Sequence, residues 1–506
     1  MASQVLRHLS SPTRTPACSG VAGTGLARTS PSAPAPLAIA PPAPAMQAIS
    51  PGVAPRAVRA LVLVLPLVLL HGRGLAEAVI ATVAALFLLH SARQRDWRWL
   101  RTTWVRVAAA WWLWLAACSL PVAGLGQGGA RSLVQAVVLV RFLVFVAALE
   151  HWVLAGTIRS DRHDSVDRAR QRAAEAHWAA TRRWLARLMA LAGLYVALQC
   201  WLQALAGRNL WGWPRWGDGS LTGPYREPRA GPPMSRLLFP AMLPAAACWM
   251  TRGRGWAALA LVLAGVVTVV LIGQRMPLLL TGLGLVVSFL LLPRLRRVAL
   301  ACLLAAALLV PATAILSPPT FGHLVTRFGQ QMRHFPESDY GRIAVRALVI
   351  ARANPWTGRG FDGYRTGCPD PSTFHTLDGG PGDGGGGAPD VCVQHPHNHY
   401  LQALTDAGLP GLLLFGLLVA AWLRGLSPGL WQGARRRRSS ADGSEAGRHA
   451  LRVGLLVAAL IQEWPIASAS SFTSMPLSGW FFLLLGLGLA EARAYMSATG
   501  DSGDPP

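Results

Sequence analysis

The stretch CVQHPHNHYLQALTDAGLPG, residues 392–411, joins a polar loop to a long apolar segment, and the rest of the chain can be ordered around it. Its loop carries three histidines at alternate positions: His395, His397 and His399. A short apolar pattern at helical spacing follows and stops at Gly408, and Pro410 then opens the next apolar run. Gly is typical of the position just past a helix, and Pro is typical of the first turn of the next helix. The pattern predicts a connecting helix that holds the histidines at the mouth of a membrane helix.

The pair His397-Asn398 heads this connecting helix. A helix N-terminus carries a partial positive charge, which favours a neutral imidazole that can accept a proton. Three interpretations stay open: a metal site, a solvated polar loop, and a catalytic or substrate-binding histidine. Alternate side chains of an extended loop diverge, and no Cys or carboxylate motif nearby completes a metal set. Because polar loops on a rigid scaffold often carry function, we favour the third, with no metal and no cofactor.

The composition is that of a protein with many membrane spans. Of the 506 residues, 52% are hydrophobic and only 14% are charged, which is unlike a soluble enzyme. All 47 residues counted as Lys or Arg are Arg. A P-loop lysine, a Schiff-base lysine and any other catalytic lysine are therefore excluded.

The formal net charge of +24 raises the question of a nucleic-acid partner. Most arginines fall in alternate short loops between apolar segments, at 93–101, 159–183, 252–254, 294–297 and 435–438. Positive residues gather in this way on the cytoplasmic side of membrane proteins, and no aromatic-basic module accompanies them. We expect these loops and both termini in the cytoplasm, and no nucleic acid as partner.

Twelve apolar segments divide the chain, several of them shorter than the ~20 residues of a perpendicular span. They are centred in residues 57–71, 74–90, 104–125, 133–156, 184–206, 236–250, 255–272, 276–293, 297–316, 409–423, 451–468 and 475–491. The predicted fold is an all-α polytopic membrane protein with about 12 transmembrane helices. The predicted domains are a disordered Pro/Ala-rich tail (1–55, with Met46 as a second candidate start), helices 1–9 (56–316), an outer loop (317–408), helices 10–12 (409–494) and a tail (495–506).

Two cysteines belong to the long outer loop. Cys368 and Cys392 flank a glycine-rich run at 379–390. On the oxidising side of the membrane they either close this run with a disulfide or stay free. Four further cysteines are expected to be buried as small hydrophobic residues: Cys118, Cys200, Cys248 and Cys302.

Several arginines face outward in this topology. Arg275 opens the eighth segment, either as an anchor at the membrane interface or as part of a substrate site. Arg342 and Arg346 are spaced i, i+4, so they share one helix face and can offer two guanidinium groups to one ligand. Guanidinium binds phosphate at two points and keeps its charge. Together with a histidine base, these arginines indicate a phosphorylated substrate.

Two charges lie inside apolar segments, where they are costly. Arg141 and Glu463 both map to the outer halves of their segments. Their matched depth motivates the hypothesis that they form an ion pair.

Three sequence elements together resemble the O-antigen ligase and polymerase superfamily, the ligase branch more than the polymerase. HN at 397–398 with GLPG at 408–411 looks like the family's His-Asn and Gly-x-x-Gly elements. RMPLL at 275–279 resembles its Arg-x-x-x-Leu element. GR at 341–342 with NPWTGRGF at 354–361 looks like the Arg…Pro…Gly-x-Gly stretch of its large periplasmic loop.

The resemblance, specific over roughly 270–425, implies a glycosyltransferase-C-like fold in the bacterial inner membrane. It also implies a metal-independent, inverting glycosyl transfer on the periplasmic face, from undecaprenyl-diphosphate-linked glycan to lipid A-core. By position, His397 would be the general base, and Arg275 and Arg342 would hold the diphosphate. Arg346 would bind substrate, as would Asn398 and His399.

The earlier outer loop departs from the family pattern, in which an Arg stands shortly before a Gly-x-x-x-Pro-like turn. The corresponding stretch here is GSLTGPYR at 219–226. Arg226 or Arg236 would supply the third phosphate contact.

Other functions remain to be weighed against the ligase. A polymerase that extends the glycan, or an oligosaccharyltransferase that acts on protein Ser or Thr, would share the donor-binding half. A polysaccharide transporter is a different class. Transporters tend to place their sites near the midplane of paired repeats, whereas here the polar residues gather outside and no repeat is evident.

Overall fold

Helices make up the part of the chain that the computed structural model describes, residues 53–122, 124–154, 165–373, 392–435, 443–469, 471–475 and 477–499. These residues contain no β-strand, and an isolated antiparallel bridge joins Arg208 to Pro214. All of them belong to one unit, residues 51–506. The all-α prediction is confirmed for these residues. The predicted tails, apart from 53–55 and 495–499, and the glycine-rich run at 379–390 lie outside them.

Each of the twelve predicted apolar segments is a helix. The helices are α1 (Val53–His71), α2 (Arg73–Gln94), α3 (Thr103–Cys118), α4 (Gly129–Ala148), α5 (Ser165–Ala206), α6 (Gly231–Thr251), α7 (Gly255–Ile272), α8 (Arg275–Leu291), α9 (Arg296–Leu316), α14 (His399–Leu426), α16 (Gly443–Gln462) and α17 (Leu477–Thr499). Within the described residues, 7 helical stretches are long and apolar enough to cross a membrane, in α2, α4, α5, α7, α9, α14 and α17. The count of twelve spans and the side on which each loop lies stay predictions.

Several helix boundaries differ from the predicted ones; α3, for example, ends at Cys118 rather than near 125. α5 begins at Ser165 rather than near 184, because the intervening sequence is rich in Ala and Arg, which favour helix. α16 ends at Gln462 rather than near 468, because Pro465 follows and the residue before a proline avoids helical angles. The connecting helix is confirmed, since α14 has non-helical angles at Gly408 (φ 67°, ψ −167°) where two helical pieces meet.

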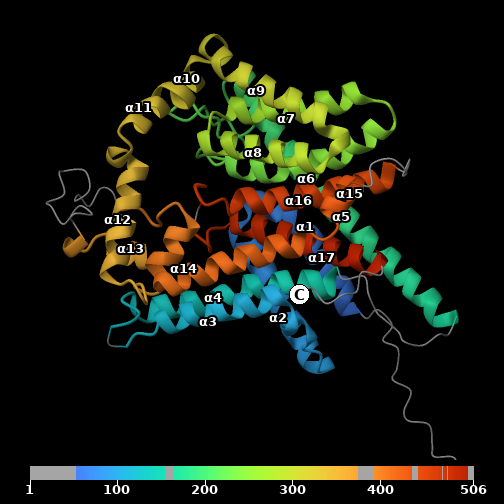
Figure 1. Ribbon diagram of the computed structural model, residues 1–506, viewed down its shortest axis with the longest axis horizontal. Helices are drawn as coiled ribbons and strands as arrows, with labels where there is room; N and C mark the ends of the chain where they lie inside the picture. The colour runs from blue at the N-terminus through green and yellow to red at the C-terminus, as the bar shows by residue number, and fades with distance from the viewer. Residues whose placement is uncertain are drawn as a thin grey trace, which may run out of the picture. The chain divides into compact units, whose positions relative to one another are not determined.

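The helix pair α6 and α16 lies at the centre of the packing. α6 also packs on α5, α7 and α8, while α14 packs on α3 and α4 packs on α2 and α17. Figure 1 shows α7, α8 and α9 on one side of the central pair and α2, α3 and α4 on the other. A Cβ atom at Gly454 of α16 would lie 2.8 Å from the carbonyl of Phe239 in α6. Close approach at such small residues is what holds membrane helices together, because lipid gives little hydrophobic drive between them.

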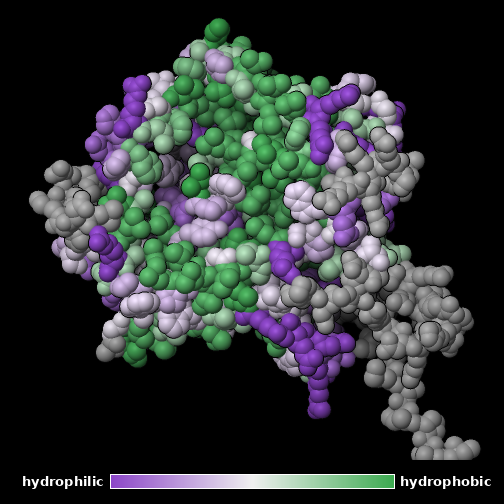
Figure 2. Space-filling view, viewed as in Figure 1, coloured by the Kyte–Doolittle hydropathy of each residue, from purple (hydrophilic) through white to green (hydrophobic). Residues whose placement is uncertain are grey.

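The segment between α9 and α14 runs along one end of the helices (Figure 1). It contains α10 (Pro318–Phe321), α11 (Arg327–Arg333), α12 (Asp339–Ala353) and α13 (Gly363–Gly367). Ser338 caps α12, because its Oγ accepts a hydrogen bond from the Gly341 amide at 3.1 Å. Figure 2 shows hydrophobic side chains over α7–α9 and over the helices opposite, with a hollow of more hydrophilic side chains between them. α12, α13 and the start of α14 lie at this end of the molecule (Figure 1), and the histidine loop directly precedes α14.

Candidate active site

Asn398 is the N-cap of α14. Its Oδ1 accepts hydrogen bonds from the amides of Tyr400 (2.9 Å) and Leu401 (3.0 Å). Its Nδ2 donates to the carbonyl of Pro465, which follows α16, at 2.7 Å. The predicted start of the connecting helix is therefore confirmed. The side-chain amide of Asn398 thus links the start of α14 to the segment that follows α16. Its hydrogen-bonding atoms are used within the protein.

His397 holds an unusual backbone conformation next to this cap. Its φ is 55°, in the left-handed region that L-residues seldom adopt. Its carbonyl accepts a hydrogen bond from the Ala469 amide at 2.8 Å. The ring centroid lies 5.8 Å from that of Tyr340 and 4.5 Å from that of His395. Strained backbone held in this way is concentrated at functional sites, which makes His397 the first candidate.

Burial lowers the pKa of two loop histidines, His395 and His397. Desolvation lowers the pKa of His397 below its ordinary value. It lowers the pKa of His395 to about 4, helped by the charges that His397 and His399 would carry. The neutral imidazole expected from the helix N-terminus is thus supported, although burial is the cause. A neutral ring near pH 7 can accept a proton.

His399 faces the interior. It is 5% exposed, its Nδ1 lies 2.9 Å from Glu463 Oε2, and its ring stacks on Phe472 at a centroid distance of 4.4 Å. The hypothesis of an Arg141–Glu463 ion pair is wrong, because Glu463 is bound to His399 and Arg141 pairs with Glu77 of α2. Two residues at equal depth in different helices need not be in contact.

The GRGF turn at 358–361 docks on the connecting helix. The amide of Arg359 donates to the Thr405 carbonyl at 2.9 Å. Gly358 has φ 61°, and a Cβ atom there would lie 2.5 Å from the Ala407 amide nitrogen. Only glycine permits this approach, so the turn and the helix that carries the histidines form one packed unit.

α12 turns its two predicted arginines in different directions. Arg342 pairs with Asp339 at 2.8 Å and keeps 25% of its side chain exposed. Arg346 is 1% exposed and donates from Nη1 to Thr373 Oγ1 (3.0 Å) and to the Cys368 carbonyl (3.3 Å). The structure therefore does not bring both guanidinium groups to one exposed surface.

Arg275 is the first residue of α8. Its Nε donates to the His323 carbonyl at 2.8 Å, and its Nη1 donates to Gln331. The Tyr340 hydroxyl interacts electrostatically with its guanidinium group. Tyr340 thus packs edge-to-face against the His397 ring and interacts electrostatically with Arg275.

Sequence reasoning missed a further cation at this end. Arg215 donates from Nη1 to Ser317 Oγ, at the start of α10, at 3.2 Å. Asp218 follows three residues later and interacts electrostatically with Arg275. Arg215 stands shortly before the turn at 219–226, where the family pattern calls for an Arg. That spacing was the signal that could have found it.

The two predicted candidates for a third phosphate contact lie in different surroundings. Arg226 lies 5.1 Å from the ring centroid of Trp213 and lines a pocket without His397. Arg236 is 4% exposed within α6, where its charge interacts with Glu463. Its Nε and Nη1 have no hydrogen-bond partner among the described residues.

A disulfide ties the histidine loop to the helix before it. Cys368 and Cys392 are bonded, with their Cα atoms 5.5 Å apart. Of the two alternatives left open by the sequence, the bonded one is present. Cys118, Cys200 and Cys302 are buried as expected, whereas Cys248 is half-buried and donates to the Gly443 carbonyl.

The candidate site combines a base, His397, with fixed positive charge on α8 and α12. Among the residues that the structure describes, no three His, Cys, Asp or Glu side chains gather closely enough to hold a metal ion. His397 can take a proton, while Arg275 and Arg342 can meet developing negative charge. Such a set suits the transfer of a group from a phosphorylated donor to a hydroxyl.

Comparison with known families agrees with this chemistry. Residues 246–416 match the sequence model of the family described as O-antigen ligase. No curated protein matches the chain. The matched region spans Arg275, Arg342 and His397 and excludes Arg226 and Arg236. Over these residues the chain is similar to the O-antigen ligase and polymerase superfamily, a resemblance that implies lipid-linked glycans and lipid acceptors in general, and the apolar helices indicate a multi-pass membrane protein.

Proposed function

We propose, from the O-antigen ligase domain at 246–416, that this protein transfers O-antigen glycan from undecaprenyl diphosphate to lipid A-core. The site faces the periplasm at the bacterial inner membrane, and the reaction needs no metal. The observation that carries the proposal is the half-buried His397 ring, which packs against Tyr340, a residue that also interacts electrostatically with Arg275. A base and a fixed cation on either side of one residue fit a hydroxyl acceptor and a diphosphate leaving group.

In the proposed reaction, neutral His397 accepts the proton of the acceptor hydroxyl while the hydroxyl oxygen attacks the anomeric carbon of the donor glycan. A new carbon–oxygen bond forms on the face opposite the diphosphate, and the bond to the diphosphate breaks, so configuration inverts. The leaving polyprenyl diphosphate gains negative charge, which Arg275 and Arg342 stabilise. Since arginine stays protonated throughout, His397 alone moves the proton.

Three other predicted site residues fit positioning roles better than substrate contact. Asn398 caps α14, His399 is held by Glu463, and Arg346 is buried against Thr373. Each fixes an element that carries His397 or Arg342. Arg215, which the structure adds to this end, is a candidate for the remaining phosphate contact.

An in vitro assay tests the proposal. Purified protein is mixed with polyprenyl-diphosphate glycan and lipid A-core in the presence of chelator, and product is followed over time. We expect His397→Ala to lose about 10²- to 10⁴-fold in rate and Arg275→Ala about 10²- to 10³-fold. His334→Ala and Arg333→Ala, exposed residues of the same outer segment, are matched controls that should keep full rate. Full activity of His397→Ala would exclude it as the base.

The same assay separates the ligase from its relatives. If wild type elongates the donor, or moves it to a protein, while lipid A-core stays unmodified, the ligase assignment falls and the polymerase or oligosaccharyltransferase takes its place. Movement of intact donor across the membrane without new glycosidic product would instead indicate a transporter. A deletion strain gives an independent readout, because loss of a ligase leaves lipid A-core bare and loss of a polymerase leaves one capped repeat.

A further inference from the structure

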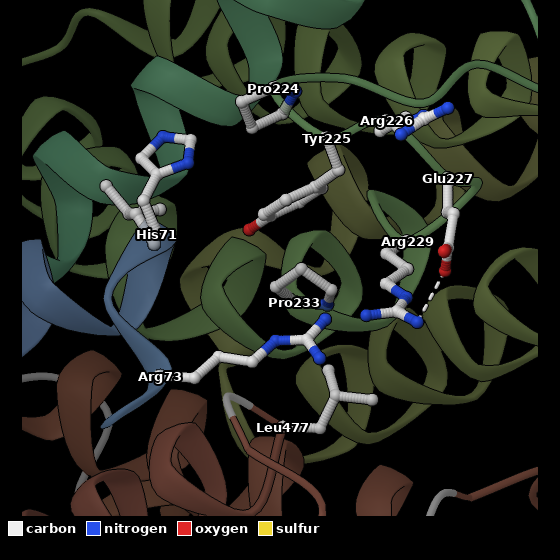
Figure 3. A pocket seen from close by; sticks show the side chains of 10 residues that line it. His71, Arg73, Pro224, Tyr225, Arg226, Glu227, Arg229, Pro233 and Leu477 are labelled. Carbon is white, nitrogen blue, oxygen red and sulfur yellow. Dashed lines mark ion pairs between the residues drawn. The ribbon is translucent and has the colours of Figure 1, made fainter. Parts of the chain in front are cut away.

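A pocket of about 250 Å³ is lined by residues outside the histidine loop. It is formed by the end of α1, the start of α2, the loop before α6, and the starts of α6 and α17 (Figure 3). Its lining residues are Leu70, His71, Arg73, Pro224, Tyr225, Arg226, Glu227, Arg229, Pro233 and Leu477. None of His397, Arg275 and Arg342 is among them, so the pocket is separate from the reacting groups.

Positive charge converges in this pocket. Arg73 and Arg229 both line it, and in the view of Figure 3 their guanidinium groups point toward the space beside Pro233. Glu227 is the one carboxylate among the lining residues, and it is paired with Arg229. Guanidinium groups of like charge repel when they approach, which an anion between them would relieve.

An unused hydroxyl points into the same space. The Tyr225 Oη is buried and has no hydrogen-bond partner among the described residues. In Figure 3 it is directed toward His71, at the end of α1. A buried polar group without a partner is costly, and a phosphate oxygen would accept its hydrogen bond.

The surroundings indicate a lipid rather than a soluble anion. Leu70 and Leu477 line the pocket together with prolines. The loop beside it exposes three tryptophans, Trp211 (57%), Trp213 (39%) and Trp216 (45%). Trp211 is joined to the pocket, because its ring lies 6.0 Å from that of His71. Exposed tryptophans are typical of the headgroup level of a bilayer, so the pocket opens at the depth of lipid phosphates.

We propose that this pocket binds the phosphate headgroup of a membrane lipid that is not the glycan donor. The phosphate lies between Arg73 and Arg229 and accepts from Tyr225, while the acyl chains leave past Leu70 and Leu477. A phosphomonoester lipid suits two guanidinium groups best, because it carries the most charge on one phosphate. The site goes beyond the proposed transfer reaction and does not depend on it.

Native mass spectrometry of the purified full chain tests the site, with phosphatidic acid as probe. Dioleoylglycerol supplies the same chains without phosphate, and inorganic phosphate supplies the anion without chains. The variant Arg73→Gln/Arg229→Gln should weaken retention of phosphatidic acid by at least about tenfold, since two charge-assisted hydrogen bonds are lost. Arg208→Gln, an exposed arginine of the same loop, is the matched control and should leave retention unchanged.

The outcomes separate the alternatives. Retention of phosphatidic acid, but not of dioleoylglycerol, that is lost in the double variant supports the proposal. Equal retention of dioleoylglycerol would make the pocket a hydrophobic groove, and tight binding of inorganic phosphate that lipid does not improve would make it a soluble-anion site. Retention that is unaffected by the double variant would also overturn the proposal. The His397→Ala protein should retain the lipid fully, so failure of the catalytic proposal would leave this one standing.

Discussion

Gly408 is the position where the helix that carries the catalytic candidate changes direction. Its backbone angles, φ 67° and ψ −167°, lie in a region that only glycine adopts at low cost. A Cβ atom there would meet the backbone of Trp356, 2.4 Å from the carbonyl carbon and 2.5 Å from the oxygen. Both obstacles are backbone atoms, so no side-chain rotation can relieve them.

The cost of Gly408→Ala follows from these two terms. The backbone conformation alone costs about 1–3 kcal/mol for a residue with a Cβ. The overlap with Trp356 adds to this, because contacts shorter than 3 Å force a backbone shift. We expect a loss of about 3 kcal/mol or more in the free energy of unfolding, together with a displaced connecting helix and reduced glycan transfer.

Gly416 provides the matched control, since it lies in the same helix and a Cβ atom there would meet nothing within 4 Å. Gly416→Ala should be neutral or stabilising by about 0.5–1 kcal/mol, because alanine favours helix. Thermal unfolding of both variants in the same detergent measures the difference, and the transfer assay measures its consequence. If the two variants unfold at the same temperature, the kink at Gly408 does not require glycine and the reasoning fails.

Two further predictions concern the histidine loop. Removing the disulfide with Cys368→Ala/Cys392→Ala, across a sequence separation of 24, should cost about 3.5 kcal/mol by chain entropy; reductant should destabilise wild type by a similar amount and leave the double variant unaffected. Burial lowers the pKa of His395 to about 4 and lowers that of His397, so the folded chain binds fewer protons than the unfolded chain between pH ~6.5 and ~4. Stability should therefore fall as pH drops through that window, and thermal unfolding should show a shallower pH dependence in His395→Gln.

The features that the sequence predicted correctly are those that depend on residues close together in the chain. Every apolar segment is a helix, because long apolar runs satisfy their backbone hydrogen bonds internally. Asn398 caps α14 and Gly408 breaks it, as residue preferences at helix ends indicate. These features depend on neighbours in sequence, so one sequence is sufficient to find them.

Partners distant in sequence could not be found in this way. The i, i+4 spacing placed Arg342 and Arg346 on one face of α12, yet which part of that face is buried depends on Thr373 and the Cys368 carbonyl. Glu463 and its partner His399 are 64 residues apart. Hydropathy fixes depth along the membrane normal but not the rotation of a helix or the identity of its neighbour, and both are needed to pair charges.

The absence of lysine gives the proposed site a simple response to pH. Every fixed cation near His397 is an arginine, which stays charged over the whole range in which the protein is folded. Below the range in which tyrosine ionises, His397 is then the proposed catalytic group whose charge changes, while the arginines proposed to bind the donor keep theirs. The acid limb of kcat should therefore lie below pH ~6.5, the ordinary value for histidine, because burial lowers the pKa of His397. If the rate at saturating donor falls at acid pH while the donor KM stays unchanged, the proton transfer is assigned to an imidazole. If only the donor KM changes with pH, the titrating group belongs to the substrate.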